Sequence, residues 1–157
     1  MAPLFDRLRR VKSPVESQPL RALDRRELRA SVRHELERLL NTRSTTTAAR
    51  FATADLTVVN YGLPDTTAFS PWSNEDQQRL AILVTRAVTA FEPRLRDVTA
   101  SVALILEYPQ ALLVTLRATL LDEPVIMAVS KPLRNGDRVY VDVQALPEDD
   151  VHLTTPQ

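Results

Sequence analysis

Residues 80–106 read LAILVTRAVTAFEPRLRDVTASVALIL, and the hydrophobic period changes once within them. Before the FEPR tetrapeptide, apolar residues recur at steps of three and four, as on one stripe of an α-helix. After it they recur at steps of two, the period of a strand with one buried face. The helical stripe comprises Leu80, Leu83, Val84, Ala87, Val88 and Phe91, and the strand face comprises Val98, Ala100, Val102, Leu104 and Leu106. Pro93 separates the two elements, because proline disfavours helical geometry in the residue before it.

The junction Phe91-Glu92-Pro93-Arg94 contains one residue that breaks a local rule. Glu92 puts a carboxylate at the carboxyl end of the expected helix, where the macrodipole favours Lys or Arg by about 0.3–1 kcal/mol. Residues that break such rules often lie at functional or partner-facing positions, so Glu92 and Arg94 are candidates for a functional pair. The simpler interpretation is a surface acid and base beside a helix-stopping proline.

A second amphipathic helix is expected to begin after Asp24, which forms a capping box with Glu27. Its apolar face comprises Leu28, Val32, Leu36, Leu39 and Leu40. Ser73 and Asp76 form a similar box before the helix that ends at the junction. Further strands are expected over residues 112–120, 125–129 and 138–143, with a turn at Asn135-Gly136-Asp137. The fold class is therefore α+β, with two main helices packed on one face of a three- to four-stranded antiparallel sheet.

The connection between the two helices has weaker signals. The hydroxyl run from Ser44 to Thr47 is expected to be a mobile loop. The hydrophobic periodicity of residues 54–65 does not distinguish a short helix from an extended chain. Gly62 within them predicts a tight turn, with positive φ as the reason for a glycine.

One domain is expected over residues 23–146, between an amino-terminal docking arm at 1–22 and a flexible acidic tail at 147–157. Leu4, Phe5 and Leu8 are expected to dock on a partner, because they would otherwise be exposed on a loose arm. The alternative for the arm is a disordered start.

Composition argues against several functions. The chain has 157 residues with no cysteine, two glycines and two histidines, so no phosphate-binding loop, thiol catalysis or His/Cys zinc site is expected. Neither Glu35 with Glu37 nor Glu92 with Glu107 has the geometry of a glycosidase pair. No enzyme activity, cofactor or metal is therefore expected. No apolar run approaches the ~20 residues that span a bilayer, and the amino terminus lacks a signal-peptide layout. A cytoplasmic protein without membrane insertion is the resulting expectation.

Charge is unevenly distributed along the chain. Residues 1–50 hold 12 Lys or Arg against 6 Asp or Glu, and residues 51–157 hold 8 against 14. This asymmetry favours an acidic partner for the amino-terminal half. A nucleic-acid partner is not expected, because the arginines alternate with acids and only Phe5 is aromatic among the first fifty residues.

Four short motifs, in order along the chain, resemble those of one family. They are Leu4-Phe5-Asp6-Arg7-Leu8, Leu40-Asn41-Thr42-Arg43, Asn60-Tyr61-Gly62-Leu63-Pro64-Asp65 and Phe91-Glu92-Pro93-Arg94-Leu95. Over residues 4–145 the chain resembles the baseplate wedge family of contractile tails. Its bacterial branch is TssE of the type VI secretion system, and its phage branch is a tail baseplate protein often mislabelled as a lysozyme.

The resemblance implies a structural duty in a sixfold baseplate. It implies wedge partners (TssF, TssG and TssK), sheath partners (TssB and TssC) and a cytoplasmic location within a membrane-docked baseplate. It also implies a fold shared with the sheath subunit, so that the first sheath ring polymerises on this chain. Within the motif, the resemblance implies that Glu92, Pro93 and Arg94 hold the wedge together.

The physical mechanism expected for sheath templating is β-augmentation, in which an open sheet edge accepts a strand from a neighbouring chain. The fourth strand is the expected edge because it is short and charged, which makes Arg138 and Tyr140 candidate contacts. Glu92→Ala or Arg94→Ala is expected to leave the monomer folded and to abolish assembly. A peptidoglycan hydrolase and, less favoured, an arginine-rich nucleic-acid-binding module are the alternatives.

Overall fold

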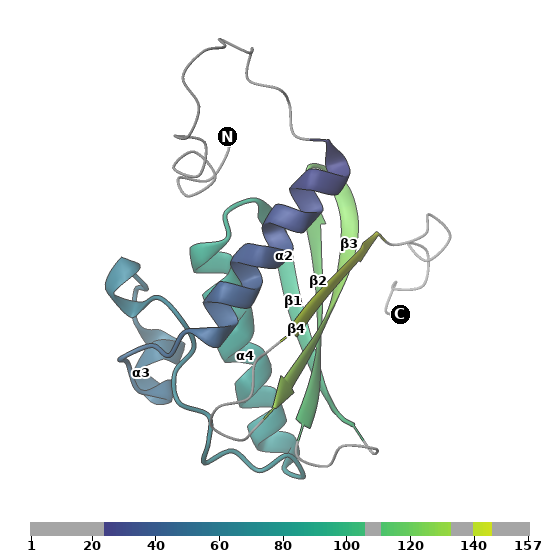
Figure 1. Ribbon diagram of the computed structural model, residues 1–157. Helices are drawn as coiled ribbons and strands as arrows, with labels where there is room; N and C mark the ends of the chain where they lie inside the picture. Colours follow the sequence, from purple (N-terminus) through teal and green to yellow (C-terminus); the bar gives the residue numbers. More distant parts are fainter. Residues whose placement is uncertain (1–23, 106–110, 133–139, 146–157) are drawn as a thin grey trace, which may run out of the picture.

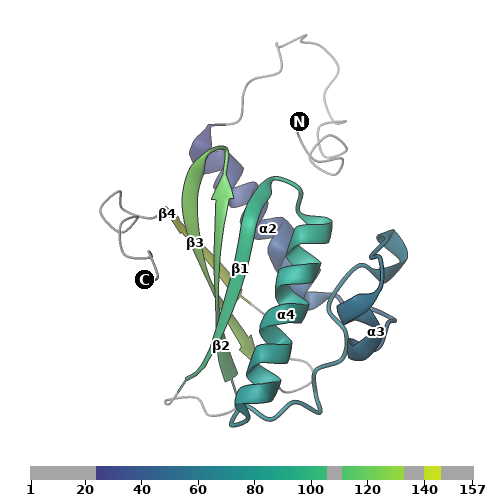
Figure 2. The ribbon, with the colours of Figure 1, turned by 180° about the vertical axis from the view of Figure 1, so that it is seen from behind.

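Two helices pack on one face of a four-stranded antiparallel sheet (Figures 1 and 2). The computed structural model describes residues 24–105, 111–132 and 140–145. The helical elements are α2 (Arg25–Asn41), α3 (Ala48–Thr53), the 3-10 turn η1 (Val58–Asn60) and α4 (Asn74–Phe91). The strands are β1 (Leu95–Leu104), β2 (Ala111–Leu120), β3 (Glu123–Pro132) and β4 (Tyr140–Ala145), in that spatial order. The predicted α+β fold class is confirmed.

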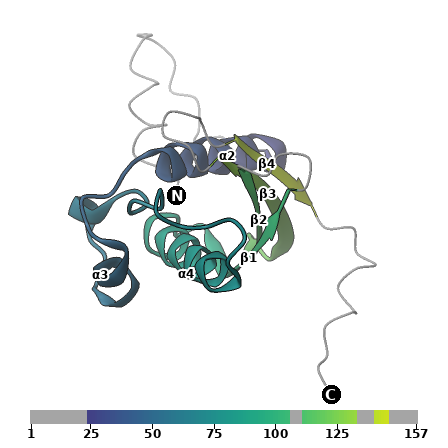
Figure 3. The same cartoon turned by 90° about the horizontal axis from the view of Figure 1, so that it is seen from below.

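The two long helices begin and end where the sequence predicts. Glu27 accepts a hydrogen bond from the Asp24 backbone N–H at 3.4 Å, and Ser73 accepts one from the Asp76 N–H at 3.3 Å. The apolar stripe of each helix faces the sheet, and only Phe91 among the predicted stripe residues is partly exposed. Viewed from below, α2 and α4 form one layer and the strands the other (Figure 3). Burial of the two stripes therefore fixes both helices on the same sheet face.

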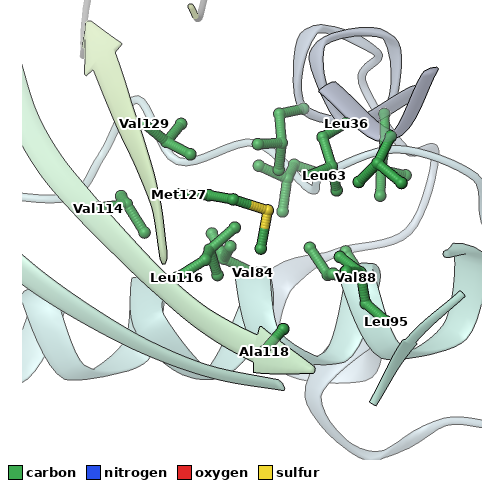
Figure 4. Packing of buried hydrophobic residues seen from close by; sticks show 14 of the residues in the cluster. Leu36, Leu63, Val84, Val88, Leu95, Val114, Leu116, Ala118, Met127 and Val129 are labelled. Carbon is green, nitrogen blue, oxygen red and sulfur yellow. The ribbon is translucent and has the colours of Figure 1, made fainter. Parts of the chain in front are cut away.

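Buried and more exposed residues alternate along the strands, as the two-residue period of the sequence predicts. Every second residue of β2 is buried, and these residues meet the helical stripes and Met127 of β3 in one core (Figure 4). The fully or nearly buried β2 residues are Leu112, Val114, Leu116, Ala118 and Leu120. The corresponding residues of β1 from Val98 to Leu104 face the same core but are only partly buried. The core is therefore complete over the centre of the sheet and thinner along β1.

The β2–β3 connection is a two-residue turn. Leu120 pairs with Glu123, and the intervening Leu121 and Asp122 have φ values of 48° and 65°. Positive φ at both central residues defines a type I′ turn, whose twist matches that of the flanking strands. Asp97 in β1, at φ 51°, marks a bulge where the register with β2 shifts.

The hydroxyl run at 44–47, expected to be a mobile loop, is held in place at both of its ends. Ser44 is buried, and its hydroxyl donates to the Asn60 carbonyl at 2.9 Å. Thr47 caps the short helix α3, which the sequence analysis missed because six residues carry no detectable period. Arg86 of α4 donates to the carbonyls of Phe51 and Ala54 and so holds α3 against the domain.

The structure shows the conformation of residues 58–63, for which periodicity did not distinguish a short helix from an extended chain. After η1, the chain forms a parallel bridge between Arg43 and Leu63. Gly62 has φ 112°, which confirms the predicted turn with positive φ. The expected arm at 1–22, the acidic tail at 147–157, the turn at 135–137 and Leu106 lie outside the described residues.

Candidate partner-binding site

The junction between α4 and β1, residues 91–94, is called the elbow, and its shape is set by the backbone around Pro93. Glu92 is the C-cap of α4, and its N–H still donates to the Val88 carbonyl at 2.9 Å. Its own carbonyl accepts from the Leu95 N–H at 3.1 Å, which closes a tight turn over the exposed Pro93. The helix therefore ends and the strand begins within four residues, as the change of period predicts.

Glu92 and Arg94 form an ion pair inside the domain. The Arg94 guanidinium donates to the carboxylate through Nε at 2.7 Å and Nη2 at 2.6 Å, and the Arg94 backbone N–H donates at 3.2 Å. Glu92 is only 3% exposed. The interpretation of a surface acid and base is therefore wrong. The guanidinium supplies the positive charge that the end of α4 favours, so the dipole rule is satisfied by a residue two positions further along.

Arg94 also connects the elbow to the other long helix. Its Nη1 donates to the Ser31 hydroxyl of α2 at 3.0 Å. A charged hydrogen bond thus joins the elbow to α2 at the point where the sheet begins, between residues 63 positions apart in sequence. Spacing alone gave no signal for Ser31, because the contact exists only once both helices lie on the sheet.

Tyr61 packs on the same elbow. Its ring meets that of Phe91 edge to face, with centroids 5.2 Å apart and planes at 64°. Partial burial raises the pKa of the Tyr61 phenol above its ordinary 10.0; the carboxylates of Glu35 and, to a lesser degree, Glu92 act in the same direction, and Arg38 opposes them. Tyr61 belongs to the motif at 60–65, and nothing in its spacing predicts that it packs on this elbow.

Tyr61 should make the folded domain sensitive to alkali. Because the folded state keeps this phenol protonated to a higher pH than the unfolded chain does, its contribution to stability is present below about pH 10 and is lost as pH rises through the folded-state pKa. An ultraviolet difference titration of the folded wild type against Tyr61→Phe should isolate the Tyr61 phenol, which should ionise above the ordinary tyrosine pKa of 10.0. Tyr61→Phe should also delay alkaline unfolding. A Tyr61 phenol that ionises at or below pH 10.0 would contradict this assignment.

The described sheet has two edges, β1 and β4. Tyr140 begins β4 and pairs with Ser130, which agrees with the expectation that the fourth strand lies at an edge. The β1 edge from Val98 to Ile105 contains no charged residue. Its outward-facing residues Thr99, Ser101 and Ala103 are exposed. An uncharged edge of this length has none of the Lys or Pro residues that commonly block strand addition.

The structure describes only some of the other predicted contact residues. Leu4, Phe5, Leu8 and Arg138 lie outside the described residues. Partner binding by Glu92, Pro93, Arg94 and Tyr140 stays a prediction, and only Pro93 of the elbow triplet is exposed. Within the described ranges, no group of three His, Asp or Glu side chains could hold a metal ion. Over the same ranges, no helix combines the length and hydrophobicity needed to cross a bilayer.

These features define a small structural module. The charged groups of its elbow bind each other, and the edge strand of its sheet has backbone groups that a strand from another chain could bind. A family model provides the identification: the chain belongs to the family of the baseplate wedge protein gp25, whose model matches residues 26–125. That range includes α4, all of α2 except its first residue, the elbow and the β2–β3 turn. Membership implies a structural role in a baseplate and contacts with other baseplate components. A search of curated proteins finds no match to the chain.

Proposed function

We propose that this chain is a TssE-type wedge subunit of a type VI secretion baseplate. In this role it binds the wedge subunits TssF, TssG and TssK, and it templates the first ring of TssB and TssC sheath subunits. It would act in the cytoplasm, within a baseplate docked at the membrane. Family membership supports the baseplate role.

The observation that best supports sheath templating is the exposed and uncharged edge of β1. An edge strand leaves backbone N–H and C=O groups unpaired, and exposed edges without charge or proline invite another strand. Val98, Ala100, Val102 and Leu104 face the core yet stay partly exposed, whereas their β2 neighbours are buried. A fifth strand with apolar residues at alternate positions would cover this row and complete the core.

The β4 edge is the alternative acceptor. It was favoured from sequence because it is short and charged, but charge on an edge is a common device against strand addition. β4 has six residues and carries Asp142, whereas the uncharged part of β1 from Val98 to Leu104 has seven. The β1 edge therefore offers the longer and less protected ladder, and we favour it as the acceptor.

The two rival functions are less consistent with the side-chain contacts. Arg25 and Arg29 of the arginine-rich helix pair with Glu123, and Arg38 pairs with Glu35, so these cations are partly neutralised for nucleic acid. Glu92 is bound by Arg94, which suits a structural carboxylate better than the acid of a hydrolase. A cell-wall clearing assay should be negative for the purified chain.

A lysine placed on the edge tests strand addition. Ser101→Lys puts a charge on the exposed face of β1 and should reduce sheath polymerisation on assembled wedges roughly tenfold or more, because charged edge residues oppose strand addition. The readout is the yield of sheath rings in electron micrographs and the fraction of TssB–TssC that sediments with the wedge.

Ala128→Lys is the matched control. Ser101, Thr115 and Ala128 are register partners on neighbouring strands, and Ala128 is exposed on the central strand β3. It therefore carries the same charge on the same row and sheet face, away from the edge. Loss with Ser101→Lys alone supports augmentation at β1. Equal loss with both variants would indicate docking on the open face instead, and no loss with Ser101→Lys would refute the β1 edge.

A further inference from the structure

The face of the sheet opposite the helices, called the open face, carries two exposed arginines. Figure 3 shows both long helices on the other side of the strands. Arg117 is exposed between the buried Leu116 and Ala118 of β2, and side chains alternate between the two faces of a strand, so Arg117 lies on the open face. Arg96 of β1 is also exposed and pairs with Thr119, two positions beyond Arg117 on β2. Residues directly opposite each other share a face, so both arginines lie on the same surface.

These two arginines have like charge and no partner in the described part of the chain. Arg96 and Arg117 are diagonal neighbours across β1 and β2, and residues in that relation lie about 7–8 Å apart. Within residues 24–105, 111–132 and 140–145, neither guanidinium forms a hydrogen bond or an ion pair. Asp97 follows Arg96 in the chain, in the bulge of β1, and does not pair with it. An anionic group placed on the open face would therefore relieve the repulsion between the two arginines.

Strand β4 ends in the rows of the sheet that hold these arginines. Gln144 pairs with Ile126, and Ile126 pairs with Arg117, so the three residues form one row across the sheet. β4 ends one residue later, at Ala145. The residues that follow, 146–157, are therefore attached at the end of the open face where the two arginines lie.

The acids that follow β4 can reach both arginines. Residues 146–157 contain the acidic tripeptide Glu148-Asp149-Asp150 and no Lys or Arg. At the usual strand spacing, β2 lies about 10 Å from β4, and β1 lies about 14 Å from it. The three to five extended residues from Ala145 to the tripeptide span about 10–17 Å, which matches both distances. Pro147 lacks the N–H that would continue the ladder with β3, which favours departure of the chain from the line of β4 before the tripeptide.

We propose that the tripeptide at 148–150 docks on the open face of its own chain and pairs with Arg96 and Arg117. The short connection to β4 gives the tripeptide a high effective concentration at the arginines, which an acidic segment of a separate chain lacks. Composition alone predicts a loose tail, whereas the register of β2, β3 and β4 brings the start of the tail within reach of two cations of opposite sign to its acids. A partner that binds this corner of the open face would first have to displace the tail.

A spin label on the tail of the full chain tests this docking. The chain has no cysteine, so His152→Cys provides a single attachment site next to the tripeptide. In about 0.01 M salt, where charges act over about 30 Å, the label should broaden the amide NMR signals of Thr99, Arg117 and Thr119. In about 1 M salt, where that range falls to about 3 Å, these signals should regain their intensity, because exposed ion pairs are screened by salt.

Two pairs of substitutions separate docking at these arginines from attraction by net charge. Arg96→Gln with Arg117→Gln should abolish the broadening at low salt. Arg26→Gln with Arg33→Gln is the matched control, because both residues are exposed on α2, across the sheet from the open face. This control removes the same charge and should leave the broadening unchanged.

Two results would overturn the proposal directly: no broadening of these signals at low salt, or equal loss of broadening with both pairs of substitutions. A mixture of spin-labelled chain and isotope-labelled chain without the spin label reports contacts between chains only. Equal broadening in that mixture would assign the contact to a second copy and would also overturn the proposal. The experiment contains no baseplate partner, so its result is independent of the proposed function.

Discussion

Glu92→Ala is expected to lower the free energy of unfolding by about 3–5 kcal/mol, the usual cost of removing one partner from a buried ion pair. The substitution deletes the acceptor of three Arg94 hydrogen bonds and leaves the guanidinium with Ser31. Because the Arg94 side chain is only 14% exposed, water replaces those bonds poorly. The loss is a large fraction of the roughly 5–15 kcal/mol that stabilises a typical domain, and urea unfolding followed by circular dichroism measures it.

This result differs from the expectation based on sequence alone, in which the monomer stays folded and only assembly fails. The burial of the carboxylate is the reason for the change. A double-mutant cycle with Arg94→Ala should show strong coupling, since the two single variants remove the same interaction. Arg94→Lys should recover little of it, because one ammonium cannot reproduce a two-point contact with the carboxylate. Additive effects of the two alanine variants would contradict the pair geometry.

The pair can also be separated from partner recognition. Replacing both charges by methionine keeps volume at the elbow without a buried ion, and such replacements are often neutral for stability. If the pair acts by supporting the elbow, this double variant should both fold and bind the wedge subunits. A variant that folds normally but no longer binds them would show that a partner reads the charges directly.

The long elements of this fold could be predicted because their signals are local. The apolar stripe of α4 and the alternation of β2 each follow from residue spacing within one element, and the break between elements follows from Pro93. The buried residues of α4 and β2 are those that this spacing predicts. Helix α3 could not be predicted, since its position depends on Arg86, more than thirty residues away. Short segments take their structure from tertiary contacts more than from period.

At the elbow, the local sequence identifies an unusual residue but does not identify its binding partner. A carboxylate at the end of a helix is correctly identified as unusual from sequence, but spacing cannot tell whether its partner is another chain or its own arginine. The contacts in the folded domain decide this, because the Glu92 carboxylate accepts from the Arg94 guanidinium, which also donates to Ser31 of the opposite helix. In the same way, the sequence marks Leu121 only as one more apolar residue, and its positive φ appears once the register of β2 with β3 places it in a two-residue turn.

Gly62→Ala is the second substitution with a large expected effect. A Cβ at this position would lie 2.4 Å from the Thr42 carbonyl oxygen and 3.0 Å from the Ser44 nitrogen, both of them backbone atoms. Those two groups hydrogen-bond to Leu63, through the Leu63 N–H at 2.8 Å and its carbonyl at 2.7 Å. The added methyl group therefore separates the two segments that the Arg43–Leu63 bridge joins.

The cost of this change has two sources. An alanine held at φ 112° carries strain of about 1–3 kcal/mol, and the loss of two hydrogen bonds adds about 1 kcal/mol each. We expect the free energy of unfolding to fall by roughly 3 kcal/mol or more, measured by urea unfolding against Thr45→Ala, an exposed substitution in the same connection that should change it by less than about 0.5 kcal/mol. Hydrogen exchange should increase first at the Ser44 and Leu63 amides, because the bridge opens before the sheet does. Wild-type stability in Gly62→Ala would mean that the chain can move apart at Thr42 without loss, and the close approach of these two segments would then have no structural role.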